Sequence, residues 1–141
     1  MKITIRPTVA VVDDDPDDRF LLERAFEECR PDLRIIFFEG GDPLLDSLRR
    51  GAGGDAEAPD LVITDLHFGE KTGFELIEEL RADPGLRHIP IVVLTGSPVE
   101  NEVERCYRLG ANTVIAKPDF FNDLVETLRG LSDYWFGPIK M

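Results

Sequence analysis

Five short apolar runs, spaced at nearly regular intervals, constrain the fold of this chain most. They cover residues 9–12, 35–38, 61–63, 91–94 and 114–116, and the intervals between them are 22, 22, 27 and 19 residues. Such intervals are too long for hairpins, but they accommodate a loop, a helix of about three turns and a second loop, which parallel strands require. Because the runs do not alternate apolar and polar residues, they favour a doubly wound parallel sheet with helices on both faces.

The segments between the runs carry helix signals. Three helices are predicted to begin at a capping residue followed by proline: Asp15-Pro16, Asp42-Pro43 and Ser97-Pro98, the last with Glu100 placed for a capping box. The final helix is predicted from apolar residues at helical spacing: Phe120, Leu124, Leu128, Leu131 and Trp135. A weaker helical pattern follows Gly73, and residues 51–59 have no periodicity, which predicts a flexible connection.

Composition narrows the function classes. A chain of 141 residues with 43% apolar content suits one compact domain, and 28 acidic against 16 basic residues give a net charge of -12. This charge disfavours direct binding to nucleic acids or anionic membranes. The longest apolar run has four residues, far below the roughly 20 that span a bilayer. With no secretory signal pattern and only Cys29 and Cys106, we expect a cytoplasmic protein with free, buried thiols and no zinc site.

Polar side chains follow four of the five predicted strands. Asp13 and Asp14 follow the first strand, Asp65 the third, Thr95 the fourth and Lys117 the fifth. Ligands of open α/β sheets bind beyond the carboxyl ends of the strands, so these side chains are expected to share one site.

Three carboxylates in one site require compensating positive charge. Each pair at about 4 Å costs from about 1 kcal/mol in water to about 4 kcal/mol at a partly shielded surface. A divalent cation together with Lys117 would cancel the charges of Asp13, Asp14 and Asp65, and oxygen-only ligands indicate Mg²⁺. A carboxylate beside this ion is equipped to attack phosphorus, and we predict that it is Asp65.

Four segments in this order resemble the receiver domain of two-component response regulators. They are Asp13-Asp14-Asp15-Pro16, Thr64-Asp65-Leu66 with Gly73 eight residues beyond Asp65, Thr95-Gly96-Ser97, and Ala116-Lys117-Pro118. The resemblance covers nearly the whole chain. It implies the flavodoxin-like (βα)5 fold, a five-stranded parallel sheet in the order 2-1-3-4-5. We expect a single receiver domain over residues 1–141, with a core from about 8 to 134 and an apolar tail over 134–141.

The resemblance also implies a role for each site residue. Asp65 would accept a phosphoryl group from a sensor histidine kinase. Mg²⁺ would be bound directly by Asp14, by Asp13 mainly through water, by Asp65, and by the backbone carbonyl of His67. The imidazole of His67 is expected to face solvent.

Thr95 and Lys117 would act on the phosphoryl group. Thr95 would donate a hydrogen bond to its oxygens, and Lys117 would pair with Asp65 or its phosphate. The Lys117–Pro118 bond resembles the cis peptide of the family. The neighbouring acids Asp15, Asp17 and Asp18 are assigned to helix capping rather than to the site.

Three positions depart from the family pattern. Val114 stands where receivers usually carry the Tyr or Phe that turns inward with the Thr or Ser. Gly69 stands where many receivers have proline, and Thr72 stands where Asp or another polar residue often precedes the glycine. The domain is expected to assist its own phosphorylation and dephosphorylation without being an enzyme that acts on a separate substrate.

The C-terminal residues 134–141 are unusually apolar for a chain end. They either fold back on their own helix or form a contact surface. We favour a contact surface for a homodimer or a partner protein, and expect a homodimer through the fourth helix, fifth strand, fifth helix and tail. This tail and the Asp-Pro-Asp-Asp start of the first helix resemble single-domain receivers that serve phytochrome-type sensor kinases.

Two alternatives remain open at this stage. Asp13 and Asp15 also fit the Asp-x-Asp pattern of a haloacid-dehalogenase-like, Mg²⁺-dependent phosphatase, although Asp17 stands where that pattern requires Thr or Val, and the chain has no room for a cap domain. The second alternative is a receiver-like binding module that no longer accepts phosphate, for which Val114 is the only indication.

Overall fold

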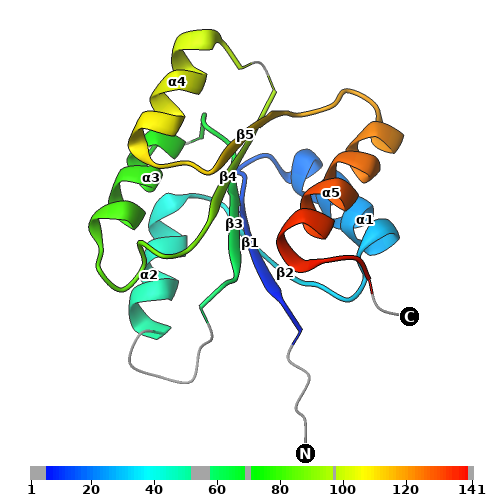
Figure 1. Cartoon of the computed structure of the whole chain (residues 1–141), viewed down its shortest axis with the longest axis horizontal. Coiled ribbons are helices and arrows are strands. Elements are labelled where there is room, and N and C mark those ends of the chain that lie inside the picture. Colours follow the sequence, from blue (N-terminus) through cyan, green and yellow to red (C-terminus); the bar gives the residue numbers. More distant parts are fainter. Residues whose placement is uncertain (1–5, 52–57, 69–70, 97, 140–141) are drawn as a thin grey trace, which may run out of the picture.

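Strands and helices alternate regularly along the chain (Figure 1). The computed structural model describes residues 6–51, 58–68, 71–96 and 98–139. The elements in chain order are β1 (Thr8–Val12), α1 (Pro16–Cys29), β2 (Arg34–Phe38), α2 (Gly41–Gly51), β3 (Leu61–Thr64), α3 (Gly73–Ala82), β4 (Ile91–Thr95), α4 (Glu100–Leu109), β5 (Thr113–Ala116) and α5 (Phe121–Phe136). Each predicted strand is confirmed to within one residue at either end.

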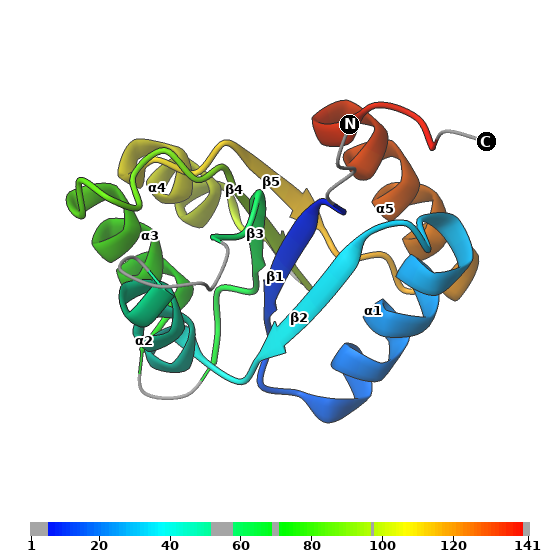
Figure 2. The same ribbon diagram turned by 90° about the horizontal axis from the view of Figure 1, so that it is seen from below.

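The five strands form one parallel sheet in the order β2-β1-β3-β4-β5. Helices α1 and α5 cover one face, and α2, α3 and α4 cover the other (Figure 2). The predicted flavodoxin-like fold is therefore confirmed. The register pairs Val12 of β1 with both Phe38 and Thr64, so the carboxyl ends of the central strands lie at one edge of the sheet.

The two faces of the sheet are both apolar because each central strand is buried along its length. In β1, Val9 and Val11 point into the cluster under α1 and α5, whereas Ala10 and Val12 point into the cluster under α2, α3 and α4. This arrangement explains why the strand sequences lack the apolar–polar alternation of a sheet with one solvated face.

The predicted helix starts are partly confirmed. Asp15 caps α1 by accepting a hydrogen bond from the amide of Asp17, and Pro16 is the first helical residue. Asp42 does not cap α2, which begins one residue earlier at Gly41. The Asp42 carboxylate instead lies 2.9 Å from the ammonium of Lys71.

Helices α3 and α4 begin differently from the prediction. A full capping box, formed by Thr72 and Glu75, begins α3. Ser97 lies outside the described residues, but the predicted start at Pro98 is wrong. Helix α4 begins at Glu100 after Val99, which makes no side-chain capping bond. Most of the predicted flexible connection, residues 52–57, also lies outside the described residues.

A buried arginine holds the end of α5 against the end of α1. Arg30 is only 3% exposed, and its guanidinium donates to Asp32, Asp133 and the carbonyl of Gly137. Beside it, Trp135 and Phe136 pack against the cluster under α1 and α5. The first part of the apolar tail therefore folds onto its own domain.

The tail also contains one exposed aromatic side chain. Tyr134 is 78% exposed, in contrast to its neighbours Trp135 and Phe136. Cys29 and Cys106 are free and buried, as expected, and burial raises the pKa of each thiol. Among the described residues, we find no helix with the length and apolarity needed to cross a bilayer.

We predict that Gly73→Ala destabilises the protein. A Cβ atom at this position would lie 2.4 Å from the carbonyl oxygen of Asp65 and 2.9 Å from the Cα of Leu66, so the backbone would have to move. The expected loss in the free energy of unfolding is about 1–3 kcal/mol, measured by urea denaturation.

The matched control is Gly130→Ala in the exposed part of α5. A Cβ atom there meets nothing within 4 Å, and alanine favours the helix by about 0.5–1 kcal/mol. The same substitution should therefore change stability in opposite directions at the two positions. A Gly73 variant as stable as wild type would contradict this tight packing of the β3–α3 loop.

Candidate functional site

The carboxyl ends of β1, β3 and β5 bring Asp13, Asp65 and Lys117 together in one pocket. The Nζ atom of Lys117 lies 3.1 Å from Oδ2 of Asp13 and 3.7 Å from Oδ2 of Asp65. The side chain of Lys117 is 14% exposed, that of Asp13 is 3% exposed and that of Asp65 is 17% exposed. The three charges therefore interact in an environment largely shielded from water. The expected convergence of these three residues is present.

A fourth site residue, Asp18, was assigned by sequence reasoning to capping alone. Its Oδ2 lies 2.9 Å from Nζ of Lys117, closer than either of the other carboxylates. Asp18 lies four residues before the buried Leu22 of α1. Residues at this spacing share one helix face, so the periodicity of α1 contained the signal that Asp18 points inward.

A backbone amide and an arginine side chain both bind Asp13. Its Oδ1 accepts a hydrogen bond of 3.0 Å from the amide of Asp15, and its backbone carbonyl accepts one of 2.8 Å from Arg19. Burial raises the pKa of Asp13, and this effect outweighs the Asp15 amide and the Lys117 charge, which both lower it. The carboxylate is therefore held in place at an electrostatic cost.

The Lys117 ammonium is stabilised in its charged form. Burial by itself would lower the pKa of Lys117, but the hydrogen bond to Asp18 and the charges of Asp13 and Asp65 outweigh burial, so the pKa is raised. The backbone amide of Lys117 donates to the carbonyl of Thr95 at 2.8 Å, which ties β5 to the end of β4.

Asp65 has one oxygen occupied and one directed toward the lysine. Its Oδ1 accepts a hydrogen bond of 2.7 Å from the amide of Leu66, and Oδ2 faces Lys117. The backbone amide of Asp65 also donates to the carbonyl of Val12 at 3.2 Å. Both the backbone and the side chain of Asp65 are thus oriented before any ligand arrives.

The remaining predicted site residues surround this pocket or lie beside it. Thr95 is buried at the end of β4, and Asp14 is exposed next to Asp13. His67 is exposed, and its Nε2 lies 3.3 Å from a carboxylate oxygen of Glu102 on α4. His67 thus connects the loop after Asp65 with α4.

The predicted cis bond before Pro118 is wrong. All described peptide bonds are trans, including the bond between Lys117 and Pro118. Lys117 reaches the acids in this trans geometry because the hydrogen bond from its amide to Thr95 places the start of its side chain at the sheet edge.

The pocket has the donor chemistry and the charge for a hard divalent cation. Within the described residues, no three or more His, Cys, Asp or Glu side chains are grouped around a common point as in a finished metal site. However, Asp13, Asp18 and Asp65 share a single ammonium, which leaves two negative charges uncompensated. Carboxylate oxygens with this excess charge suit Mg²⁺ or Mn²⁺ better than a soft metal.

Comparisons with known proteins agree with this geometry. The family model of the response regulator receiver domain matches residues 9–129. The probable methanogenesis regulatory protein FilR2 of Methanothrix harundinacea is 33% identical over 129 residues, which are 92% of this chain and 83% of that protein. Response regulator Rcp1 of Synechocystis sp. is 27% identical over 134 residues, 94% of this chain and 91% of Rcp1.

Solved structures give the same result. The phosphorylated cyanobacterial phytochrome response regulator RcpA superposes with a TM-score of 0.86 at 27% identity, covering 96% of this chain and 98% of RcpA. The Mn²⁺-bound form of Rcp1 superposes with a TM-score of 0.81 at 25% identity and the same coverage. The sequence match, the strand order and the pocket of acids around a lysine therefore assign this chain to the receiver domains of two-component response regulators.

Proposed function

We propose that the protein is a stand-alone response regulator that accepts a phosphoryl group from a sensor histidine kinase on Asp65. The observation that carries this proposal is the position of the Lys117 ammonium between Asp13, Asp18 and Asp65. A receiver needs an oriented carboxylate with positive charge beside it, and both are present here. The phosphorylated structure of the relative RcpA supports the same chemistry.

The transfer is a substitution at phosphorus. The Oδ2 atom of Asp65 forms the new O–P bond, the N–P bond of the donor phosphohistidine breaks, and the departing imidazole nitrogen takes up a proton. Hydrogen bonding from Leu66 holds the other carboxylate oxygen, so the nucleophile is oriented. Lys117 stabilises the negative charge of the transferred group, and Thr95 is placed at the end of β4 to donate a hydrogen bond to it.

Mg²⁺ is the cofactor that we assign to this pocket. The residues that would hold it are Asp13, Asp14, Asp65 and the backbone carbonyl of His67. When bound, the ion neutralises phosphoryl oxygens and the excess charge of the acids. Rcp1 was crystallised with Mn²⁺, an ion with similar ligand preferences, which supports a divalent cation here.

The phosphorylation signal would leave through α4, β5 and α5. The amide of Val114 in β5 donates a 3.1 Å hydrogen bond to the hydroxyl of Tyr107 in α4, and His67 contacts Glu102 near the start of α4. Because Val114 replaces the usual ring, we assign the aromatic contact between α4 and β5 to Tyr107. Inward movement of Thr95 would shift β5 through the Lys117 amide and so move this contact.

Partner binding is the output that fits this surface. Val99, Tyr107, Phe120 and Tyr134 are large apolar side chains of this region that remain substantially exposed. We propose that a homodimer uses this α4–β5–α5 surface and the tail, and that a phytochrome-type kinase is the phosphoryl donor in the cytoplasm. The acidic net charge of -12 argues against direct DNA binding.

We predict one phosphoryl group per chain after treatment with acetyl phosphate and Mg²⁺. Intact-mass spectrometry should show a single adduct on the wild type and none on Asp65→Asn, because the amide is not nucleophilic. Chelation with EDTA should lower the adduct by at least about tenfold, since the charge of the acids then opposes the incoming anion.

Asp17→Asn is the matched control for this experiment. Asp17 is an exposed acid at the start of α1, and the ion pairs of Lys117 with described residues involve Asp13, Asp18 and Asp65 instead, so its substitution should leave the adduct unchanged. An adduct that persists in Asp65→Asn would refute the assignment of the acceptor. Wild type without any adduct would favour a receiver-like binding module, and steady hydrolysis of a phosphate ester would favour a phosphatase.

We predict that Asp13→Asn stabilises the protein in EDTA at pH 7. The pKa of Asp13 is raised in the folded state above its usual value of about 4. As the pH rises from this usual value to the raised pKa, ionisation of the buried carboxyl therefore lowers the free energy of unfolding. Removing the charge should increase the free energy of unfolding by on the order of 1 kcal/mol.

Urea denaturation at several pH values tests this sign. The advantage of Asp13→Asn should shrink as the pH falls toward about 4, where the wild-type carboxyl becomes protonated. The variant should also gain less stability than wild type from added Mg²⁺, because one ligand is lost. A variant less stable than wild type at pH 7 in EDTA would contradict a desolvated Asp13.

We predict that Thr95→Val separates phosphorylation from the surface change. Valine keeps the shape of threonine but cannot donate a hydrogen bond to the phosphoryl oxygens. The mass adduct should persist, whereas the NMR shifts of the Tyr107 and Val114 amides on phosphorylation should fall by at least about half. Shifts equal to those of the wild type would exclude Thr95 from the coupling.

A further inference from the structure

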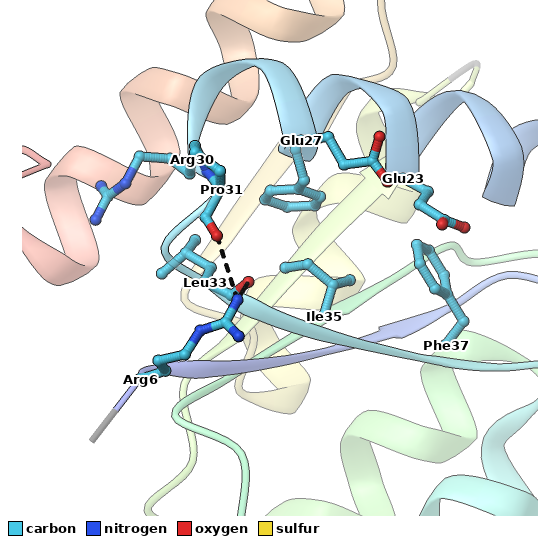
Figure 3. A pocket seen from close by; sticks show the side chains of 9 residues that line it. Arg6, Glu23, Glu27, Arg30, Pro31, Leu33, Ile35 and Phe37 are labelled. Atoms are coloured by element: carbon cyan, nitrogen blue, oxygen red, sulfur yellow. Dashed lines mark hydrogen bonds between the residues drawn. The ribbon is translucent and has the colours of Figure 1, made fainter. Parts of the chain in front are cut away.

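At the β2 edge of the sheet, a groove lies between α1 and β2 (Figure 3). It encloses a volume of about 300 Å³. Its lining includes Glu23, Phe26, Glu27, Leu33, Ile35 and Phe37. None of these residues belongs to the acidic pocket around Lys117, so the groove is a separate feature of the surface.

The floor of the groove is apolar. Ile35 and Phe37 of β2 point toward α1 (Figure 3), and both pack against the core cluster that contains Phe26 of α1. Phe26 is fully buried, but Ile35 and Phe37 are only partly buried at the border of the core cluster. Covering these two side chains would remove further apolar surface from water.

The net charge at the groove is negative. Glu23 and Glu27 lie one helical turn apart on α1, and neither forms an ion pair with another described residue. Among the described residues, Arg6 donates only to the neutral carbonyls of residues 31–33 and keeps its positive charge, whereas Arg30 forms ion pairs with Asp32 and Asp133. The carboxylates at the groove still outnumber these two guanidinium groups, four to two. A ligand that fits this charge carries basic groups.

The two edge strands, β2 and β5, differ in the hydrogen bonds that side chains make to their backbones. At β5, the hydroxyl of Tyr107 accepts a hydrogen bond from the Val114 amide and so occupies part of that edge. In the part of the chain that the structure describes, no side chain makes such a bond to the backbone of β2. An edge strand with unpaired amide groups is a template for an added strand.

We propose that the groove binds an extended segment of a partner protein, which adds to β2 as a further strand. The segment would place apolar side chains at alternate positions beside Ile35 and Phe37, on the face covered by α1. Its basic side chains would lie near Glu23 and Glu27. Backbone pairing with β2 supplies affinity, while the apolar floor and the two carboxylates select the sequence.

The test uses a six-residue peptide that alternates valine and lysine, acetylated and amidated at its ends. Titration of the ¹⁵N-labelled full chain should shift the amides of Ile35 and Phe37 most. A peptide that alternates valine and glutamate should bind more weakly by at least about tenfold. A valine–lysine peptide with N-methyl groups on alternate amides should also lose binding, because it cannot pair along the edge.

Charge reversal provides the matched pair of variants. Glu23→Lys with Glu27→Lys should weaken binding of the valine–lysine peptide by roughly five- to tenfold. Glu78→Lys with Glu104→Lys changes the net charge equally on exposed positions of α3 and α4 and should change binding less than about twofold. The N-methylated peptide needs no variant, so the test remains decisive if a charge reversal impairs folding.

Several outcomes would overturn the proposal. Equal weakening in both double variants would mean that the peptide binds the acidic surface in general. Undiminished binding of the N-methylated peptide would exclude strand addition. Shifts at Ile35 and Phe37 that grow with protein concentration without peptide, together with dimer formation in sedimentation, would show that a second copy of the chain occupies the groove.

Discussion

The ion pairs of the Lys117 ammonium hold together the carboxyl edge of the sheet. Lys117 binds Asp13 of the β1–α1 junction, Asp18 of α1 and Asp65 after β3, while its own backbone is bonded to Thr95 of β4. Removal of Lys117 would leave the carboxylates of Asp13, Asp18 and Asp65 without their shared positive charge, and loss of the compensating partner of buried charges commonly costs about 3–5 kcal/mol. The same contacts that hold the strand ends together therefore also orient the carboxylate of Asp65.

The strands and their terminal residues could be predicted from the sequence because apolar runs and polar ends are local signals. Asp18 was missed because an acid in the first turn of a helix satisfies the capping pattern, and only its inward position reveals the contact with Lys117. Asp42 failed as a cap for a similar reason, since Lys71 from a distant segment attracts its carboxylate. Local patterns do not report contacts between segments far apart in the chain.

At the Val114 position, a side chain from another element contacts β5. A valine in β5 cannot supply an aromatic ring, but Tyr107 of α4 reaches the same strand and bonds to the amide of that very residue. This contact ties α4 to β5 through a backbone group, so any residue at position 114 except proline could maintain it. The sequence of β5 alone therefore does not reveal how α4 is coupled to the sheet.

Strand order separates the two proposed surfaces while leaving a short route between them. Because β2 and β5 lie at opposite edges, a segment bound at β2 would not collide with a partner at α4 and β5. Yet the amide of Asp13 donates to the carbonyl of Phe38 at the end of β2, only one residue beyond Phe37 of the groove. If a segment on β2 shifts this bond, it moves the buried carboxylate that binds Lys117. By linkage, phosphorylation of Asp65 would then change affinity at the groove by the same free energy.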